Sequence, residues 1–164
     1  MNFKHWKQTL FSLDRYENGG DAKTFTALIA QKPADASERQ YIEALLQTFS
    51  NQDDYGIQES VLTVLDGVAQ AVFFETLGNM FQEFLNNTEE QEWGLLLLGR
   101  TVNSCNEAAI KEMVFAAQKC TDKTMLEFLK SEEFCSEYPE ILPFLASAYA
   151  VSPNPTKPSG YLKF

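Results

Sequence analysis

The sequence predicts an all-α protein in which short helices form a stack of helical hairpins. Apolar residues recur with the period of an α-helix along most of the 164 residues. No stretch alternates between apolar and polar residues for long enough to require a β-strand. A segment near the middle of the chain repeats at a fixed offset, which is typical of stacked hairpins. We therefore expect about eight or nine helices in a single domain at residues 1–150.

The first half of the chain contains amphipathic segments separated by capping and turn residues. Asn18-Gly19-Gly20 ends the first segment and Asp21 can cap the second. Lys32-Pro33 closes the second, because the residue before proline avoids the α region. Ser37 and Gln40 form a capping-box pattern before the third. The apolar faces are Phe3, Trp6, Leu10, Phe11 and Leu13; Phe25, Leu28 and Ile29; Tyr41, Leu45, Leu46 and Phe49; Ile57, Val61, Leu62 and Leu65; and Val72, Phe73, Leu77, Met80, Phe81, Phe84 and Leu85.

Further helices are expected after Asn86-Asn87. Thr88 and Gln91 repeat the capping pattern, and the helix from Trp93 to Val102 is apolar on most sides, which predicts a central position. Later starts are expected at Asn106 and Asp122, and the last helix at residues 140–150. Residues 151–164 are rich in proline and predict an extended tail. Its apolar residues, which we expect to hold it in place, are Tyr161, Leu162 and Phe164.

The sequence predicts a cytoplasmic protein that binds neither a metal nor a cofactor. Its first residues lack the apolar core of a signal peptide, and no apolar run is long enough to span a membrane. The three cysteines, Cys105, Cys120 and Cys135, are odd in number and widely spaced, which favours reduced, buried or half-buried thiols. No coiled-coil seam is present, which favours a monomer.

The net charge of −10 is concentrated in the middle of the chain. Residues 41–110 contain eleven acids and a single base, Arg100, whereas acids and bases balance elsewhere. Nucleic acid is not an expected partner, because binding it needs Lys and Arg side chains that displace counterions from phosphates. An acidic surface instead attracts a basic protein and speeds the encounter with it, although acidity also serves solubility alone.

A weak internal repeat indicates how the helices are arranged. Tyr55-Gly56-Ile57 aligns with Trp93-Gly94-Leu95 at an offset of 38 residues, and acids precede both triplets. An offset near this size, with two helices per unit, is typical of HEAT and armadillo repeats, where each helix pair buries its face only by stacking on its neighbour. We therefore predict a HEAT-like stack with an extended C-terminal tail; an irregular helical bundle is the alternative.

The sequence offers little that indicates an enzyme. Its one histidine, His5, has no nucleophile elbow or cysteine-hydrolase signature near it. Asp53-Asp54 followed by Gly56 superficially suggests a calcium loop, but the position that should carry the closing Glu is Val64. Paired carboxylates can still perform acid–base chemistry, so a helical enzyme of that kind stays open.

The segment Asp53-Asp54-Tyr55-Gly56-Ile57-Gln58-Glu59-Ser60-Val61-Leu62, in a short acidic helical chain, resembles the immunity proteins of bacterial polymorphic toxin systems. Those of contact-dependent growth inhibition are the most similar in style. The resemblance rests on residues 41–120 and on overall size and charge. It implies a protein that binds one-to-one to the catalytic domain of a delivered toxin. It implies further that the toxin is a nuclease whose basic active-site cleft is covered by an acidic surface.

The candidate contact surface lies at the two repeat starts. Exposed aromatic residues there can serve as binding anchors and the acids as charge partners. The alternative roles are helix capping for the acids and packing between stacked units for the two aromatic residues. A general HEAT-like adaptor that grips several proteins is the alternative function. The candidates are Asp53, Asp54, Tyr55, Gln58 and Glu59 in the first unit, and Glu89, Glu90, Glu92 and Trp93 in the second.

Overall fold

The structure, a computed structural model, describes residues 1–52, 54–89 and 91–148. None of these residues is in a β-strand, and the predicted all-α fold is confirmed. No described helix is both long enough and apolar enough to cross a membrane. The predicted tail at residues 151–164 lies outside the described residues. The helices are α1 (Phe3–Ser12), α2 (Gly19–Ile29), α3 (Glu38–Leu46), α4 (Ile57–Leu65), α5 (Gln70–Thr88), α6 (Glu92–Asn103), α7 (Glu107–Lys119), α8 (Thr124–Leu129), α9 (Glu132–Glu137), the 3-10 helix η1 (Pro139–Ile141) and α10 (Leu142–Ala148).

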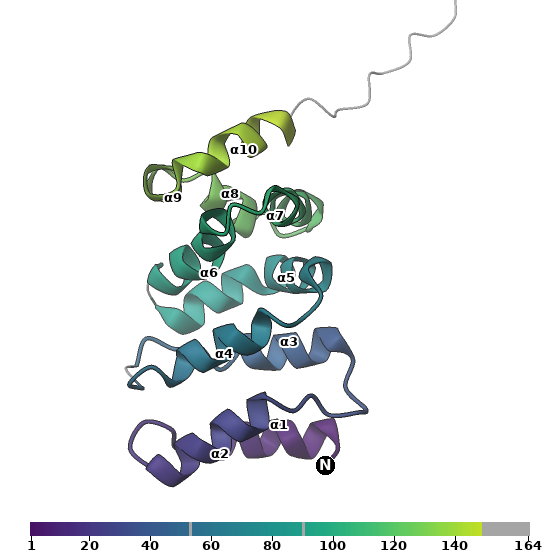
Figure 1. The fold of residues 1–164 in the computed structure, drawn as a ribbon, viewed down its shortest axis with the longest axis vertical. Helices are drawn as coiled ribbons and strands as arrows, with labels where there is room; N and C mark the ends of the chain where they lie inside the picture. Colours follow the sequence, from purple (N-terminus) through teal and green to yellow (C-terminus); the bar gives the residue numbers. More distant parts are fainter. Residues whose placement is uncertain (53, 90, 149–164) are drawn as a thin grey trace, which may run out of the picture.

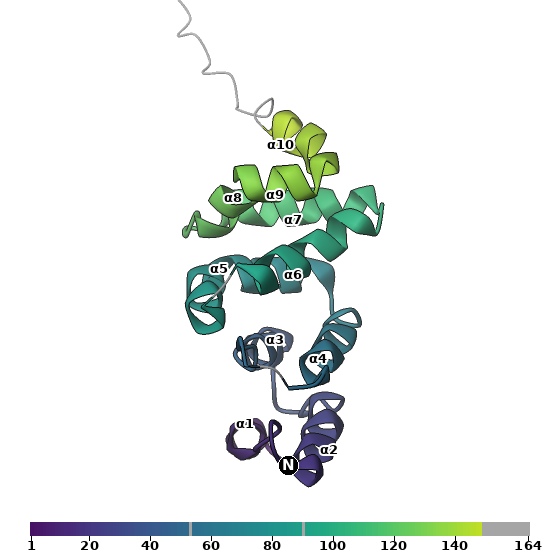
Figure 2. The same ribbon diagram turned by 90° about the vertical axis from the view of Figure 1, so that its left-hand side faces the viewer.

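The helices are stacked as hairpins along the long axis of the molecule (Figure 1). The pairs α1–α2, α3–α4 and α5–α6 follow one another, and α7 to α10 complete the stack. Helix α3 packs on α5 and α5 on α7, while α2 packs on α4. The stack also turns along its length: α1 and α3 are seen end-on in Figure 2, whereas α6, α7 and α9 run across the view. The described residues form ten α-helices and one 3-10 helix, whereas the sequence predicts about eight or nine helices; one reason is that the chain after α8 begins a separate helix, α9, at a Ser131 cap.

The longest helix, α5, occupies the centre of the core. It packs against α3, α6, α7 and α8, and it presents aromatic residues to several of them. The sequence predicts this central position for the helix at Trp93–Val102, but α6 leaves Leu96 37 % exposed and Leu95 half-buried. An apolar surface on most sides of a short helix is therefore not sufficient for burial. The buried large side chains of α5 are Phe73, Phe74, Leu77, Phe81 and Phe84.

Short polar residues start several helices, though not always those that the pattern suggests. The capping box of Ser37 and Gln40 forms at α3, as predicted. Helix α2 is capped by the Asn18 side chain, which accepts from two backbone N–H groups, so Asp21 is not its cap. Thr88 does not start a helix; it ends α5, where its hydroxyl donates to the Phe84 carbonyl at 3.0 Å. A threonine hydroxyl can form either kind of bond, so the pattern alone does not choose between them.

The three thiols differ in exposure, which gives a first testable prediction. Cys105 is exposed and Cys135 half-buried, whereas Cys120 is buried beside Gly78, where a Cβ atom would lie 2.6 Å from its Sγ. Burial, with Glu75 nearby, raises the pKa of the Cys120 thiol. In the native protein at pH 8 we expect Cys105 to react fast with Ellman's reagent and Cys120 only after local opening. The fast phase should disappear in Cys105→Ser; a fast phase that persists there would contradict the assignment.

Candidate functional site

Three hairpin turns lie along one side of the stack, on the left in Figure 1. They join the two helices of each of the first three hairpins, at residues 13–18, 47–56 and 89–91. We call these turns, together with the first turns of α4 and α6, the hairpin edge. Both predicted repeat starts fall within it, so the structure brings the two groups of candidate residues to the same side of the molecule.

The second turn is bonded to the turns on either side of it. The hydroxyls of Tyr16 and Ser50 lie 2.9 Å apart, which links the first turn to the second. The Ser50 carbonyl accepts from the Trp93 indole N–H at 3.1 Å, and Asn51 Nδ2 donates to Glu89 Oε2 at 3.0 Å. These bonds join residues 34 to 43 positions apart in the sequence. The hairpin edge is therefore a continuous bonded surface.

A buried ion pair fastens the first turn to the second. Arg15 Nε donates to Asp54 Oδ2 at 2.9 Å, and the two side chains are only 7 % and 2 % exposed. The guanidinium also donates to the Thr48 carbonyl and lies within 5 Å of two ring centroids, 4.9 Å from Tyr16 and 4.7 Å from Phe25. A buried charge persists only when it is paired and bonded in this way, so the pair fixes where the second turn lies.

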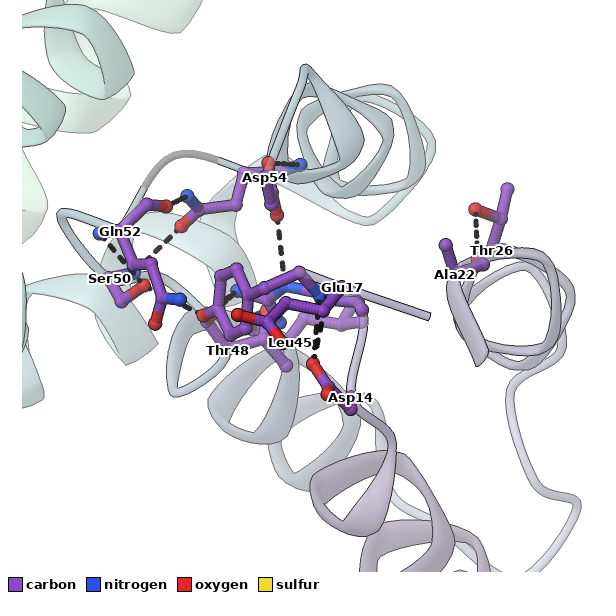
Figure 3. Close-up of polar contacts among 12 residues, drawn as sticks. Asp14, Glu17, Ala22, Thr26, Leu45, Thr48, Ser50, Gln52 and Asp54 are labelled. Atoms are coloured by element: carbon purple, nitrogen blue, oxygen red, sulfur yellow. Dashed lines mark hydrogen bonds and ion pairs between the residues drawn. The ribbon is translucent and has the colours of Figure 1, made fainter. Parts of the chain in front are cut away.

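Two of the predicted contact residues, Asp54 and Gln58, are buried and hold this turn from inside; Figure 3 shows Asp54. Asp54 Oδ1 accepts from the backbone N–H of Gln58 at 3.1 Å. Gln58, 3 % exposed, accepts from the Ser50 N–H at 2.7 Å and donates to the Gln52 carbonyl at 3.2 Å. The expectation of exposed side chains at Asp54 and Gln58 is thus corrected: burial and bonding make them residues that position the loop.

Tyr55, between these two anchors, projects outward. Its side chain is 87 % exposed, the highest value among the exposed large hydrophobic residues. Its φ is +55°, a left-handed conformation in which a bulky side chain is strained, and Gly56 follows at φ +89°. A strained backbone conformation persists where contacts with the surrounding structure hold it in place, and such conformations are concentrated at functional sites. The same conformation occurs at Glu89 and Cys105, which are also exposed, so the large exposed aromatic side chain, rather than the strain, distinguishes Tyr55.

The predicted acids Glu59, Glu89 and Glu92 are all exposed on the hairpin edge. None of the three forms an ion pair within 4 Å among the described residues. Their charges are therefore not neutralised by a close base in that part of the chain. Asp53 and Glu90 lie outside the described residues.

Trp93 has the packing role that the sequence left as an alternative. Its side chain is half-buried, and its ring meets Phe49 edge-on with 5.0 Å between centroids. The indole N–H is bonded to Ser50, as described above. Trp93 therefore joins two stacked units, whereas the Tyr55 side chain is largely exposed.

The first turn adds residues that the sequence analysis missed. Asp14 and Glu17 are exposed there, and Arg15 and Tyr16 form the contacts that hold the second turn. A signal for them exists, because Asp14-Arg15-Tyr16 aligns with Asp53-Asp54-Tyr55 at an offset of 39 residues. The segment is a third repeat start, in which Arg15 takes the position of Asp54.

Comparison of the chain with protein-family models, with curated proteins and with solved structures gives no match. A function has to be inferred from the side chains of the hairpin edge.

Proposed function

We propose that this protein binds and neutralises a basic protein domain through the hairpin edge, in the manner of the immunity proteins that its sequence resembles. The observation that carries the proposal is the juxtaposition of a projecting, 87 % exposed Tyr55 with three exposed acids that form no ion pair among the described residues, Glu59, Glu89 and Glu92. The expected partner is the catalytic domain of a nuclease toxin, bound one-to-one.

The chemistry of the surface suits a partner that normally binds nucleic acid. A nuclease cleft is lined by Lys and Arg side chains that meet phosphates, and exposed carboxylates can meet the same side chains. An acidic patch raises the association rate by steering, and a tyrosine supplies a large contact area at small entropic cost. Because the turns are bonded to one another, little ordering is required on binding.

The proposal is tested by reversing the charge of the hairpin edge and, separately, of three acids outside it. The first variant changes Glu59, Glu89 and Glu92 to Lys. The control changes Asp35, Asp66 and Glu107 to Lys, so its net charge changes by the same amount as in the first variant. These residues lie in two loops between hairpins and in the first turn of α7. Each tagged protein is expressed in the native host, and the proteins that co-purify with it are quantified.

We expect one stoichiometric basic domain with the unchanged protein and the control, and its loss from the hairpin-edge variant. The captured domain should be toxic when expressed alone and harmless when the protein is present. Its association rate should fall steeply with salt, because exposed charges are screened. A toxin bound equally by both variants would contradict the assigned surface. Several weakly bound host proteins without a toxin would instead favour the general adaptor.

A second prediction separates binding from stability at Tyr55. Tyr55→Asn should raise the free energy of unfolding by about 0.5–1 kcal/mol, because Asn tolerates the left-handed conformation better than Tyr. The same change should weaken partner binding by about tenfold or more, since it removes the aromatic anchor. Thermal unfolding and binding titrations measure the two effects. Tyr55→Phe keeps the ring and should preserve binding; equal affinity in all three proteins would exclude Tyr55 as a contact.

A further inference from the structure

We propose that residues 151–164 bind back onto the chain from which they extend, in an apolar groove between α7 and α10. The occupant is a segment of the same chain, and the site is separate from the three turns of the hairpin edge.

The groove is a hollow of the described surface that is lined mainly by apolar groups. Its volume is about 820 Å³, and α7 and α10 supply its walls. Phe115 of α7 is 49 % exposed in it, although a phenyl ring usually stays buried. Phe144, half-buried, forms the facing wall from α10. An aromatic-lined groove of this kind suits a proline-rich peptide, whose backbone is already restricted before it binds.

Residues 151–164 suit the groove between α7 and α10 in their position along the chain and in their composition. Ser147 lines the groove and stands one residue before the last described one, so the described part of the chain ends beside the groove. The twelve residues between Ala148 and Tyr161 can span about 40 Å when extended, whereas α7 with its 13 residues is about 20 Å long. The segment is therefore long enough to place Tyr161, Leu162 and Phe164 against any part of α7.

Charge and tethering favour the same occupant. Residues 151–164 contain Lys157 and Lys163 and no acidic side chain. Of the two charged side chains that line the groove, Lys111 is paired with Glu107 at 3.5 Å, whereas Glu112 forms no ion pair among the described residues. A segment attached beside its site has an effective concentration in the millimolar range, so a weak peptide contact is enough to keep the groove filled.

The experiment uses the full chain with Tyr161 replaced by p-benzoylphenylalanine, a photoactivated cross-linker. After irradiation and trypsin digestion, we expect a cross-link within one chain to the peptide of residues 112–119, which contains Phe115. Phe115→Asp should weaken the docking equilibrium by about tenfold to a hundredfold, since it removes the phenyl ring that the docked segment covers, and this cross-link should be lost. Phe11→Asp is the matched control, because Phe11 is similarly exposed, at 47 %, on α1.

A second variant leaves the helices untouched. Changing Leu162 and Phe164 to Ser should also lower the cross-link to residues 112–119, with no change in thermal unfolding of the helical stack. A mixture of isotope-labelled and unlabelled chains identifies cross-links between molecules. Cross-links between chains would overturn the proposal in favour of a second copy in the groove. Cross-links that are spread over other surfaces, or that persist in Phe115→Asp, would overturn it as well.

Discussion

Replacing Asp54 with Ala is expected to lower the free energy of unfolding by about 3–5 kcal/mol, because it leaves the buried Arg15 guanidinium without a counter-ion. The pair joins the first turn to the second at 2.9 Å, with both side chains almost fully buried. The same change removes the acceptor of the Gln58 backbone N–H at the start of α4. Chemical denaturation followed by circular dichroism measures the loss.

The control for Asp54→Ala is an ion pair on the surface. Arg100 and Asp66 lie 2.5 Å apart but are 39 % and 61 % exposed, so Arg100→Ala should cost no more than about 1 kcal/mol. A double variant, Arg15→Met with Asp54→Asn, should recover part of the stability because it removes the buried charge while keeping an acceptor for Gln58. If Asp54→Ala and Arg100→Ala cost the same, the buried pair does not fasten the turns as described.

The general architecture was predictable because it follows from properties that each segment carries by itself. The helical period of Tyr41, Leu45 and Phe49, for example, predicts α3, and the Ser37 cap gives its first residue. The repeat at Tyr55 and Trp93 predicts that two hairpin turns lie on the same side of a stack. These signals are local or periodic, so tertiary contacts are not needed to interpret them.

The roles of individual residues in the candidate site were not predictable in the same way. The sequence predicts that Asp53, Asp54 and Tyr55 form part of an exposed surface. Asp54 is nevertheless buried, because Arg15, 39 positions earlier, forms an ion pair with it. Trp93 and Tyr55 occupy equivalent positions in the repeat, but Trp93 has Phe49 and the Ser50 carbonyl within reach whereas Tyr55 projects outward. Such differences depend on long-range partners, which the pattern of one segment does not contain.

The difference between the two aromatic residues leads to the second large effect. Trp93→Ala should lower the free energy of unfolding by about 2–4 kcal/mol, somewhat less than for a fully buried tryptophan, because Trp93 is half-buried. The loss combines the edge-on contact with Phe49 at 5.0 Å and the bond to the Ser50 carbonyl, both of which join α6 to the second turn. Tyr55→Ala should change stability by no more than about 0.5 kcal/mol.

Trp93→Phe separates the two parts of this contribution. It keeps a ring against Phe49 but leaves the Ser50 carbonyl without its donor, so it should cost about 1 kcal/mol. Trp93→Ala should also displace the second turn and therefore weaken partner binding although Trp93 touches no partner, whereas Trp93→Phe should largely preserve it. Denaturation curves and binding titrations on the same variants distinguish these outcomes. If Trp93→Ala abolished binding at unchanged stability, Trp93 would itself be a contact residue, and the packing role assigned to it would be wrong.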